Sequence, residues 1–102
     1  MFCLCFQGLK SMYYVYVLRS LKDHKFYIGF TSDLRRRIKE HNEGKNISTK
    51  PGLPLKLFYY EAHLSKNDAL RREQYFKITK GKSSLKQMLR DSMQSFWPAY
   101  QE

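Results

Sequence analysis

Side chains that could act on a phosphate group occur first in the stretch YIGFTSDLRRRIKEH, Tyr27–His41, which begins like a β-strand, breaks at a glycine and continues as a basic helix. In that helix Leu34 and Ile38 form an apolar i, i+4 pair. Arg37 and His41 follow Leu34 by three and seven residues, so they extend the same stripe. Arg37 is therefore expected to face the protein body. It would serve there either as a phosphate-binding cation or as an aliphatic stem covering the core edge, and periodicity favours neither reading.

The neighbouring basic side chains lie outside this stripe. Arg35, Arg36 and Lys39 point in other directions on the same helix. We expect them to be solvated or to contact phosphates of a polyanion without reading its sequence.

A second chemical feature is Glu73, in the segment NDALRREQYFKITK. Ala69, Leu70 and Phe76 define the apolar face of a helix. Glu73 follows Ala69 by four residues and precedes Phe76 by three, in the middle of that face. A carboxylate pointing at a core must be paired, protonated or bound to a metal. Two readings stay open, namely a buried salt bridge with Arg37 as a candidate partner, and a magnesium site, because Mg²⁺ takes only one or two protein oxygens.

The elements that must position these groups begin with two strands. Tyr13–Ser20 and Phe26–Phe30 are rich in β-branched and aromatic residues and are separated by a polar turn, which predicts a β-hairpin. If the loop has four residues, Tyr16 and Tyr27 share one face as near-diagonal neighbours. A slip of one residue would place them on opposite faces.

The rest of the chain predicts alternating helix and strand. TSD and SKND supply N-cap patterns, and KGKSS is expected to break the chain between two helices. The fold class is α+β, a small three-stranded antiparallel sheet flanked by helices in the order β-β-α-β-α-α. The expected later elements are a helix over Leu34–Asn42, a strand over Leu55–Ala62, and helices over Ser65–Thr79 and Ser84–Met93.

Length and charge bound the domain organisation and the partners. The 102 residues suit one domain, and the formal net charge of +10 favours nucleic acid as the partner. We expect residues 1–11 to be an extension outside the fold, 12–93 the domain and 94–102 a tail. No apolar run approaches the roughly 20 residues of a membrane span. The two cysteines, in a C-x-C pair, suit a reduced, cytoplasmic chain.

Together these residues supply the parts that phosphodiester hydrolysis needs: a base, a metal ligand and a cation. The sequence also resembles the GIY-YIG nuclease superfamily. That family's two tripeptides correspond to YVY, Tyr14–Tyr16, and YIG, Tyr27–Gly29. The family's helix arginine, the histidine one turn later and the metal-binding glutamate match Arg37, His41 and Glu73. The resemblance spans nearly all of the chain past residue 12 and is greatest to small stand-alone bacterial members, which are similar to the nuclease domain of the excision-repair protein UvrC.

The resemblance implies a metal-dependent endonuclease acting on DNA, structure-specific or repair-related, with a protein partner as one source of targeting. Glu73 would hold one Mg²⁺ or Mn²⁺, Arg37 would stabilise phosphate charge, and Gly29 would let the backbone pass close to the site. A hairpin tyrosine would position or deprotonate the attacking water. The candidates for the general base remain Tyr16, Tyr27 and His41.

The sequence departs from the family pattern in two places. Tyr14 stands where many members have glycine, and no asparagine follows the helix of Glu73, where Ser83 and Ser84 are the nearest small polar residues. The second departure keeps an alternative open, a nucleic-acid-binding module that has lost catalysis. A third hypothesis is a small interaction domain whose charge is incidental. Oligomeric state does not follow from the sequence.

Overall fold

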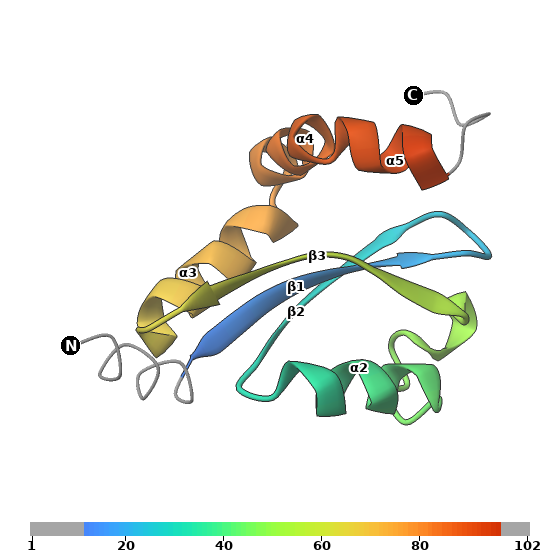
Figure 1. Ribbon diagram of the computed structural model, residues 1–102, viewed down its shortest axis with the longest axis horizontal. Helices are drawn as coiled ribbons and strands as arrows, with labels where there is room; N and C mark the ends of the chain where they lie inside the picture. The colour runs from blue at the N-terminus through green and yellow to red at the C-terminus, as the bar shows by residue number, and fades with distance from the viewer. Residues whose placement is uncertain (1–11, 97–102) are drawn as a thin grey trace.

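The computed structural model describes residues 12–96 and shows a three-stranded antiparallel sheet with helices on both faces (Figure 1). The strands are β1 (Tyr13–Ser20), β2 (Phe26–Thr31) and β3 (Leu55–His63), in the spatial order β2-β1-β3. Because β1 is the central strand, most of its residues are buried, whereas β2 is an edge strand. The α+β architecture predicted from the sequence is confirmed.

The hairpin has the register expected for a four-residue loop. The Ser20 N–H donates to the Lys25 carbonyl at 3.0 Å, and Tyr16 pairs with Gly29 across the two strands. His24 takes a positive φ of 63°, which closes the turn. Tyr16 and Tyr27 therefore lie on the same face of the sheet, as predicted.

Side chains of alternate residues of β1 belong to two separate hydrophobic cores, one on each face of the sheet. On one face, Tyr16 and Leu18 pack with Leu55, under the apolar side of α2 (Leu34–Asn42). On the other face, a second core is covered by α3 (Lys66–Lys77), α4 (Thr79–Met88) and α5 (Arg90–Phe96). Figure 1 shows α2 on one side of the sheet and α3 to α5 on the other. The residues at the centre of this second core are Val15, Val17, Ala69, Phe76 and Leu85.

A short 3-10 helix, η1 (Lys50–Gly52), lies between α2 and β3. This helix lies on the α2 side of the sheet. A hydrogen bond from the Ser20 hydroxyl to the Gly52 carbonyl, at 2.6 Å, holds it there. This contact brings the polar loop that precedes η1 next to the end of α2.

The predicted break at KGKSS is wrong, because α4 runs through it. The chain breaks instead at Ile78, whose backbone is extended, and again at Leu89 between α4 and α5. Gly81 does not end a helix. A Cβ at Gly81 would collide with the carbonyl oxygen of Tyr75, so this glycine permits the close approach of α4 to the end of α3. The single helix predicted for Ser84–Met93 is therefore two helices.

Residues 1–11 and 97–102 lie outside the described residues, and so does most of the predicted tail. The proposed boundaries of the domain stay predictions. Within residues 12–96, none of the helices combines the length and the apolar character that crossing a membrane requires.

Candidate active site

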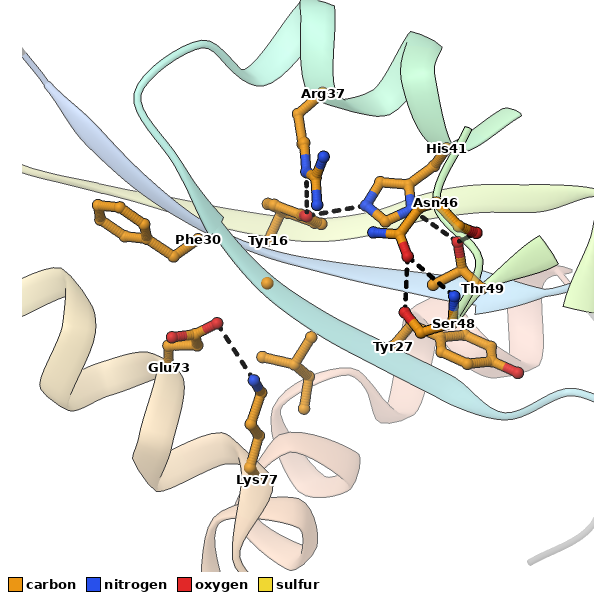
Figure 2. Close-up of a pocket in the computed structure, with 12 residues that line it drawn as sticks. Tyr16, Tyr27, Phe30, Arg37, His41, Asn46, Ser48, Thr49, Glu73 and Lys77 are labelled. Atoms are coloured by element: carbon orange, nitrogen blue, oxygen red, sulfur yellow. Dashed lines mark hydrogen bonds and ion pairs between the residues drawn. The ribbon is translucent and has the colours of Figure 1, made fainter. Parts of the chain in front are cut away.

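The Tyr16 hydroxyl is the centre of a polar group on the α2 side of the sheet. The Arg37 Nε–H donates to this oxygen at 3.3 Å, and His41 Nε2 lies 2.9 Å from it (Figure 2). Asp33 caps α2 by accepting from the Arg36 N–H at 3.2 Å, which sets the phase of the helix. The predicted stripe of Arg37 and His41 is confirmed, because both side chains reach inward to one tyrosine.

A chain of hydrogen bonds orients the imidazole of His41. Thr49 Oγ1 lies 2.8 Å from Nδ1, and the Thr49 hydroxyl donates to the Asn46 carbonyl at 3.4 Å. In the tautomer that carries its proton on Nδ1, His41 donates to the Thr49 oxygen, the Thr49 hydroxyl donates to Asn46, and Nε2 accepts from the Tyr16 O–H.

Burial sets the protonation states of this pair. Burial first, and the nearby Arg37 second, lower the pKa of His41, so the imidazole is neutral at pH 7. Burial also raises the pKa of the Tyr16 phenol, against the opposing effect of the hydrogen bond from Arg37. The carboxylate of Glu73 adds to that rise in the pKa of Tyr16, which places the two groups within electrostatic reach of each other.

Gly29 makes the position of Tyr16 possible. It lies opposite Tyr16 on the edge strand, and a Cβ there would collide with the Tyr16 ring and hydroxyl. Because Gly29 has no side chain, the Tyr16 ring can pack directly against the backbone of β2. In Figure 2, β2 passes between Tyr16, Arg37 and His41 on one side and Glu73 and Lys77 on the other.

Glu73 approaches the same edge from α3. Its side chain is 13% exposed, which agrees with the inward direction predicted for it, and its Oε2 lies 3.2 Å from the Lys77 ammonium. Arg37, the candidate partner predicted for Glu73, is wrong. Arg37 pairs with Glu40 at 3.2 Å on its own helix, because β2 separates the two sides.

One cavity of about 270 Å³ joins the two sides of the edge strand. It brings together most of the residues predicted for the site, from both tripeptides and from both helices. These are Tyr16, Tyr27, Gly29, Arg37, His41 and Glu73.

Tyr27 contributes a wall of this cavity, but its hydroxyl is directed elsewhere. It donates to Asp23 in the hairpin turn at 3.3 Å, and it packs against Gly52. Figure 2 shows the Tyr27 hydroxyl turned away from Arg37 and His41. Of the two candidate tyrosines, Tyr16 and Tyr27, only Tyr16 joins the polar group.

The other basic residues of α2 lie outside the cavity. Arg35, Arg36 and Lys39 are exposed, and none of them lines it. Arg36 is 3.8 Å from Asp33, and Lys39 is 3.9 Å from Glu43. Contact of these side chains with a polyanion stays a prediction.

Sequence reasoning missed several residues that line the cavity, among them Thr49 and Lys77. Thr49 lies in the loop KNISTKPGLP, where no local pattern signals a contact with α2. Lys77 follows Glu73 by four residues, a spacing that could have indicated the pair. Ser83 does not line the cavity, whereas an asparagine, Asn46, lines it from the loop before η1.

The residues present fit a hard divalent cation held mainly by water. Within residues 12–96 no group of three or more His, Cys, Asp or Glu side chains could hold a metal. Glu73 offers one carboxylate in a cavity of about 270 Å³. A water fills about 30 Å³, so several waters fit beside it. That is the coordination Mg²⁺ prefers, with one or two protein oxygens and retained water.

Comparison with known proteins gives the class of this domain. Residues 12–87 match the family model described as the GIY-YIG catalytic domain. The chain belongs to the GIY-YIG family, so it is a nuclease-type catalytic domain. Within that family the chain is similar to UPF0213 proteins.

Two relatives and one solved structure illustrate the match. The UPF0213 protein YazA of Bacillus subtilis is 39% identical over 75 residues, which is 72% of this chain and 75% of that protein. A UPF0213 protein of Streptococcus agalactiae is 44% identical over 70 residues, 68% of this chain and 78% of that protein. The solution NMR structure of a UPF0213 protein from Bacillus halodurans has 36% identity and a TM-score of 0.49, covering 76% of this chain and 84% of that one. These names state no activity.

Proposed function

We propose that this protein is a divalent-metal-dependent endonuclease that hydrolyses phosphodiester bonds of DNA, with Tyr16 as the general base. The observation that carries the proposal is the position of the Tyr16 hydroxyl. It is hydrogen-bonded to Arg37 and His41, and all three residues line a cavity that Glu73 also lines. A base, a cation and a carboxylate thus meet around one space large enough for a phosphate.

Tyr16 acts through His41. The raised pKa keeps the phenol protonated at pH 7, so the tyrosine alone is a weak base. When a water gives its proton to the Tyr16 oxygen, the phenolic proton passes to the neutral Nε2 of His41, 2.9 Å away. Thr49 holds the opposite nitrogen and keeps Nε2 free to accept. The Arg37 Nε–H stabilises negative charge on the phenolic oxygen during the transfer.

Arg37 also supplies positive charge to the phosphate. Its guanidinium is held by Tyr16 and Glu40, so its position is fixed before substrate binds. Preorganised charge of this kind stabilises a transition state without further rearrangement. Glu73 would hold the Mg²⁺ or Mn²⁺ ion, which when bound polarises the phosphate and offsets charge on the leaving oxygen.

DNA with nicks, flaps or branches is the proposed substrate. The support is the net charge of +10 together with a cavity at a sheet edge, where an exposed strand could enter. One observation favours a second candidate, a DNA-binding module without catalysis, because no asparagine follows the helix of Glu73.

A cleavage assay separates the two candidates. Wild type, Arg37→Ala and Glu73→Gln are incubated with nicked, flapped and branched DNA in Mg²⁺ or Mn²⁺. We expect cleavage by wild type and a loss of about 10²–10³-fold in rate for each variant. Arg36→Ala is the matched control, since Arg36 is exposed on the same helix and lies outside the cavity. If wild type and variants bind every substrate and cut none, the binding module is correct.

A further inference from the structure

We propose that Lys77 is a second phosphate ligand of this site and that it changes partners when the metal binds. In the metal-free protein its ammonium holds the Glu73 carboxylate. Once a divalent cation takes that carboxylate, Lys77 is released to bind a phosphate of the DNA strand. The inference rests on the proposed function, in which Glu73 holds the metal.

The first support is the contact with Glu73. Lys77 Nζ lies 3.2 Å from Glu73 Oε2, and the Glu73 side chain is only 13% exposed. A carboxylate so withdrawn from water needs an opposite charge beside it. Lys77 provides that charge, at the carboxylate that would hold a divalent cation. The ammonium and the metal therefore compete for Glu73.

The second support is the place and freedom of Lys77. Its side chain is 46% exposed, and it lines the cavity together with Arg37. Figure 2 shows the two cations reaching toward the cavity from opposite sides of β2. Gly29 of β2 lines the same cavity, where the Tyr16 hydroxyl occupies the place that a Gly29 side chain would take. A phosphate in this cavity would have one cation on each side of β2.

The side chains of Arg37 and Lys77 differ in rigidity, so we expect them to bind phosphate in different ways. Arg37 is a planar fork held by Tyr16 and Glu40, so it is a fixed element. Lys77 is a point charge on a flexible stem, with three donors that rotate freely. A lysine can exchange a carboxylate for a phosphate without rebuilding the site. In this way the arrival of the metal would create a second phosphate contact.

Metal binding without DNA is the first part of the test. Lys77→Met removes the charge and keeps an apolar stem. Titration with Mn²⁺, followed by the EPR signal of the free ion, should show about 2- to 5-fold tighter binding, because a competing ion pair with a half-exposed lysine is lost. Lys80→Met is the matched control. Lys80 is exposed on α4 and lies outside the cavity, so its loss should leave Mn²⁺ affinity unchanged.

DNA binding supplies the second part, in a Tyr16→Phe background that keeps the DNA intact. We expect Lys77→Met to reduce the slope of log K against log[salt] by about 0.9 in the presence of Mn²⁺ and to leave it unchanged without Mn²⁺. Lys77→Arg should restore the slope. For Lys80→Met, any change in slope should be the same with and without Mn²⁺. Only a ligand released by the metal gives a metal-dependent change.

The outcomes distinguish this inference from the function on which it rests. If Glu73→Gln abolishes Mn²⁺ binding while Lys77→Met leaves both Mn²⁺ affinity and the salt slope unaltered, the role of Lys77 is wrong and the metal site stands. If Glu73→Gln binds Mn²⁺ as tightly as wild type, Glu73 is not the metal ligand and both proposals fall. Circular dichroism of each variant confirms that it is folded.

Discussion

Two clusters in this domain contain the same kinds of side chain, a tyrosine, an arginine and a histidine, but differ in their surroundings. One joins Tyr16, Arg37 and His41 on the α2 side. The other joins Tyr59, Arg72 and His63 around a single carboxylate, Glu61, where β3 meets α3. In the second cluster the Tyr59 hydroxyl, His63 Nε2 and Arg72 Nε contact the Glu61 oxygens at 2.8, 3.0 and 2.9 Å, with a further contact from Arg72 at 3.1 Å.

The difference lies in what occupies the centre. Burial acts to raise the pKa of Glu61, but the hydrogen bonds from Arg72, His63 and Tyr59 outweigh it and lower the pKa. The Arg72 guanidinium also packs over the ring of Phe76, 4.4 Å from its centroid. Both oxygens of the Glu61 carboxylate in that cluster are therefore hydrogen-bonded within the protein. The first cluster is centred on a phenol with a raised pKa beside a cavity, and its carboxylate contact, from Glu40, is made to Arg37. The same residue types therefore build a structural clamp in one place and a reactive group in the other.

The largest expected effect comes from exchanging the two tyrosines for phenylalanine in separate variants. Tyr16→Phe removes the proposed base, so single-turnover DNA cleavage should fall by about 10²–10⁴-fold. Tyr59→Phe removes one hydrogen bond to Glu61 and should leave cleavage within about 2-fold of wild type, with a stability loss near 1 kcal/mol. Equal cleavage by the two variants would remove the functional distinction between the clusters.

An intermediate effect is expected at Glu61. Glu61→Gln keeps the shape of the side chain but leaves Arg72 without its anion, beneath the aromatic rings of α3. Urea unfolding should show a loss of about 1–3 kcal/mol. DNA cleavage by the folded variant should be unchanged, because Glu61 does not line the cavity. A large loss of cleavage at full stability would show that the clamp also belongs to the active site.

The smallest effect is the pH dependence of stability conferred by His41. Its pKa is lowered in the folded protein, so the unfolded chain takes up the proton first as the pH falls. The contribution to stability is present above the ordinary pKa near 6.5 and is lost progressively below it. We expect the fall in stability from pH 7 to pH 5 to be smaller for His41→Asn than for wild type. Identical pH profiles would show that burial does not shift this histidine.

The fold was largely predictable because its signals are local. The β-branched runs of the hairpin and the caps at Asp33 and Ser65 act within a few residues, and the structure confirms both caps. The four-residue turn fixes the register without reference to the rest of the chain. The end of α3 was not predictable, because the meaning of Gly81 depends on how closely two helices approach.

The directions of the side chains at the candidate site were predictable in part. Helical phase gave the inward direction of Arg37, His41 and Glu73, whereas their roles came from the family resemblance and stay predictions. Helical phase could not give partners across the sheet. The pairing of Glu73 with Lys77 rather than Arg37 depends on β2 passing between the helices, and the bond from Thr49 to His41 spans a loop of irregular structure.

The most direct test of the account is a crystal of this protein soaked in manganese and measured at the manganese absorption edge. We predict an anomalous peak beside the Glu73 carboxylate, in the cavity between Tyr16 and α3, with the Lys77 ammonium displaced from its present contact. A peak at another site in protein that cleaves DNA, with Glu73 still bound to Lys77, would contradict it.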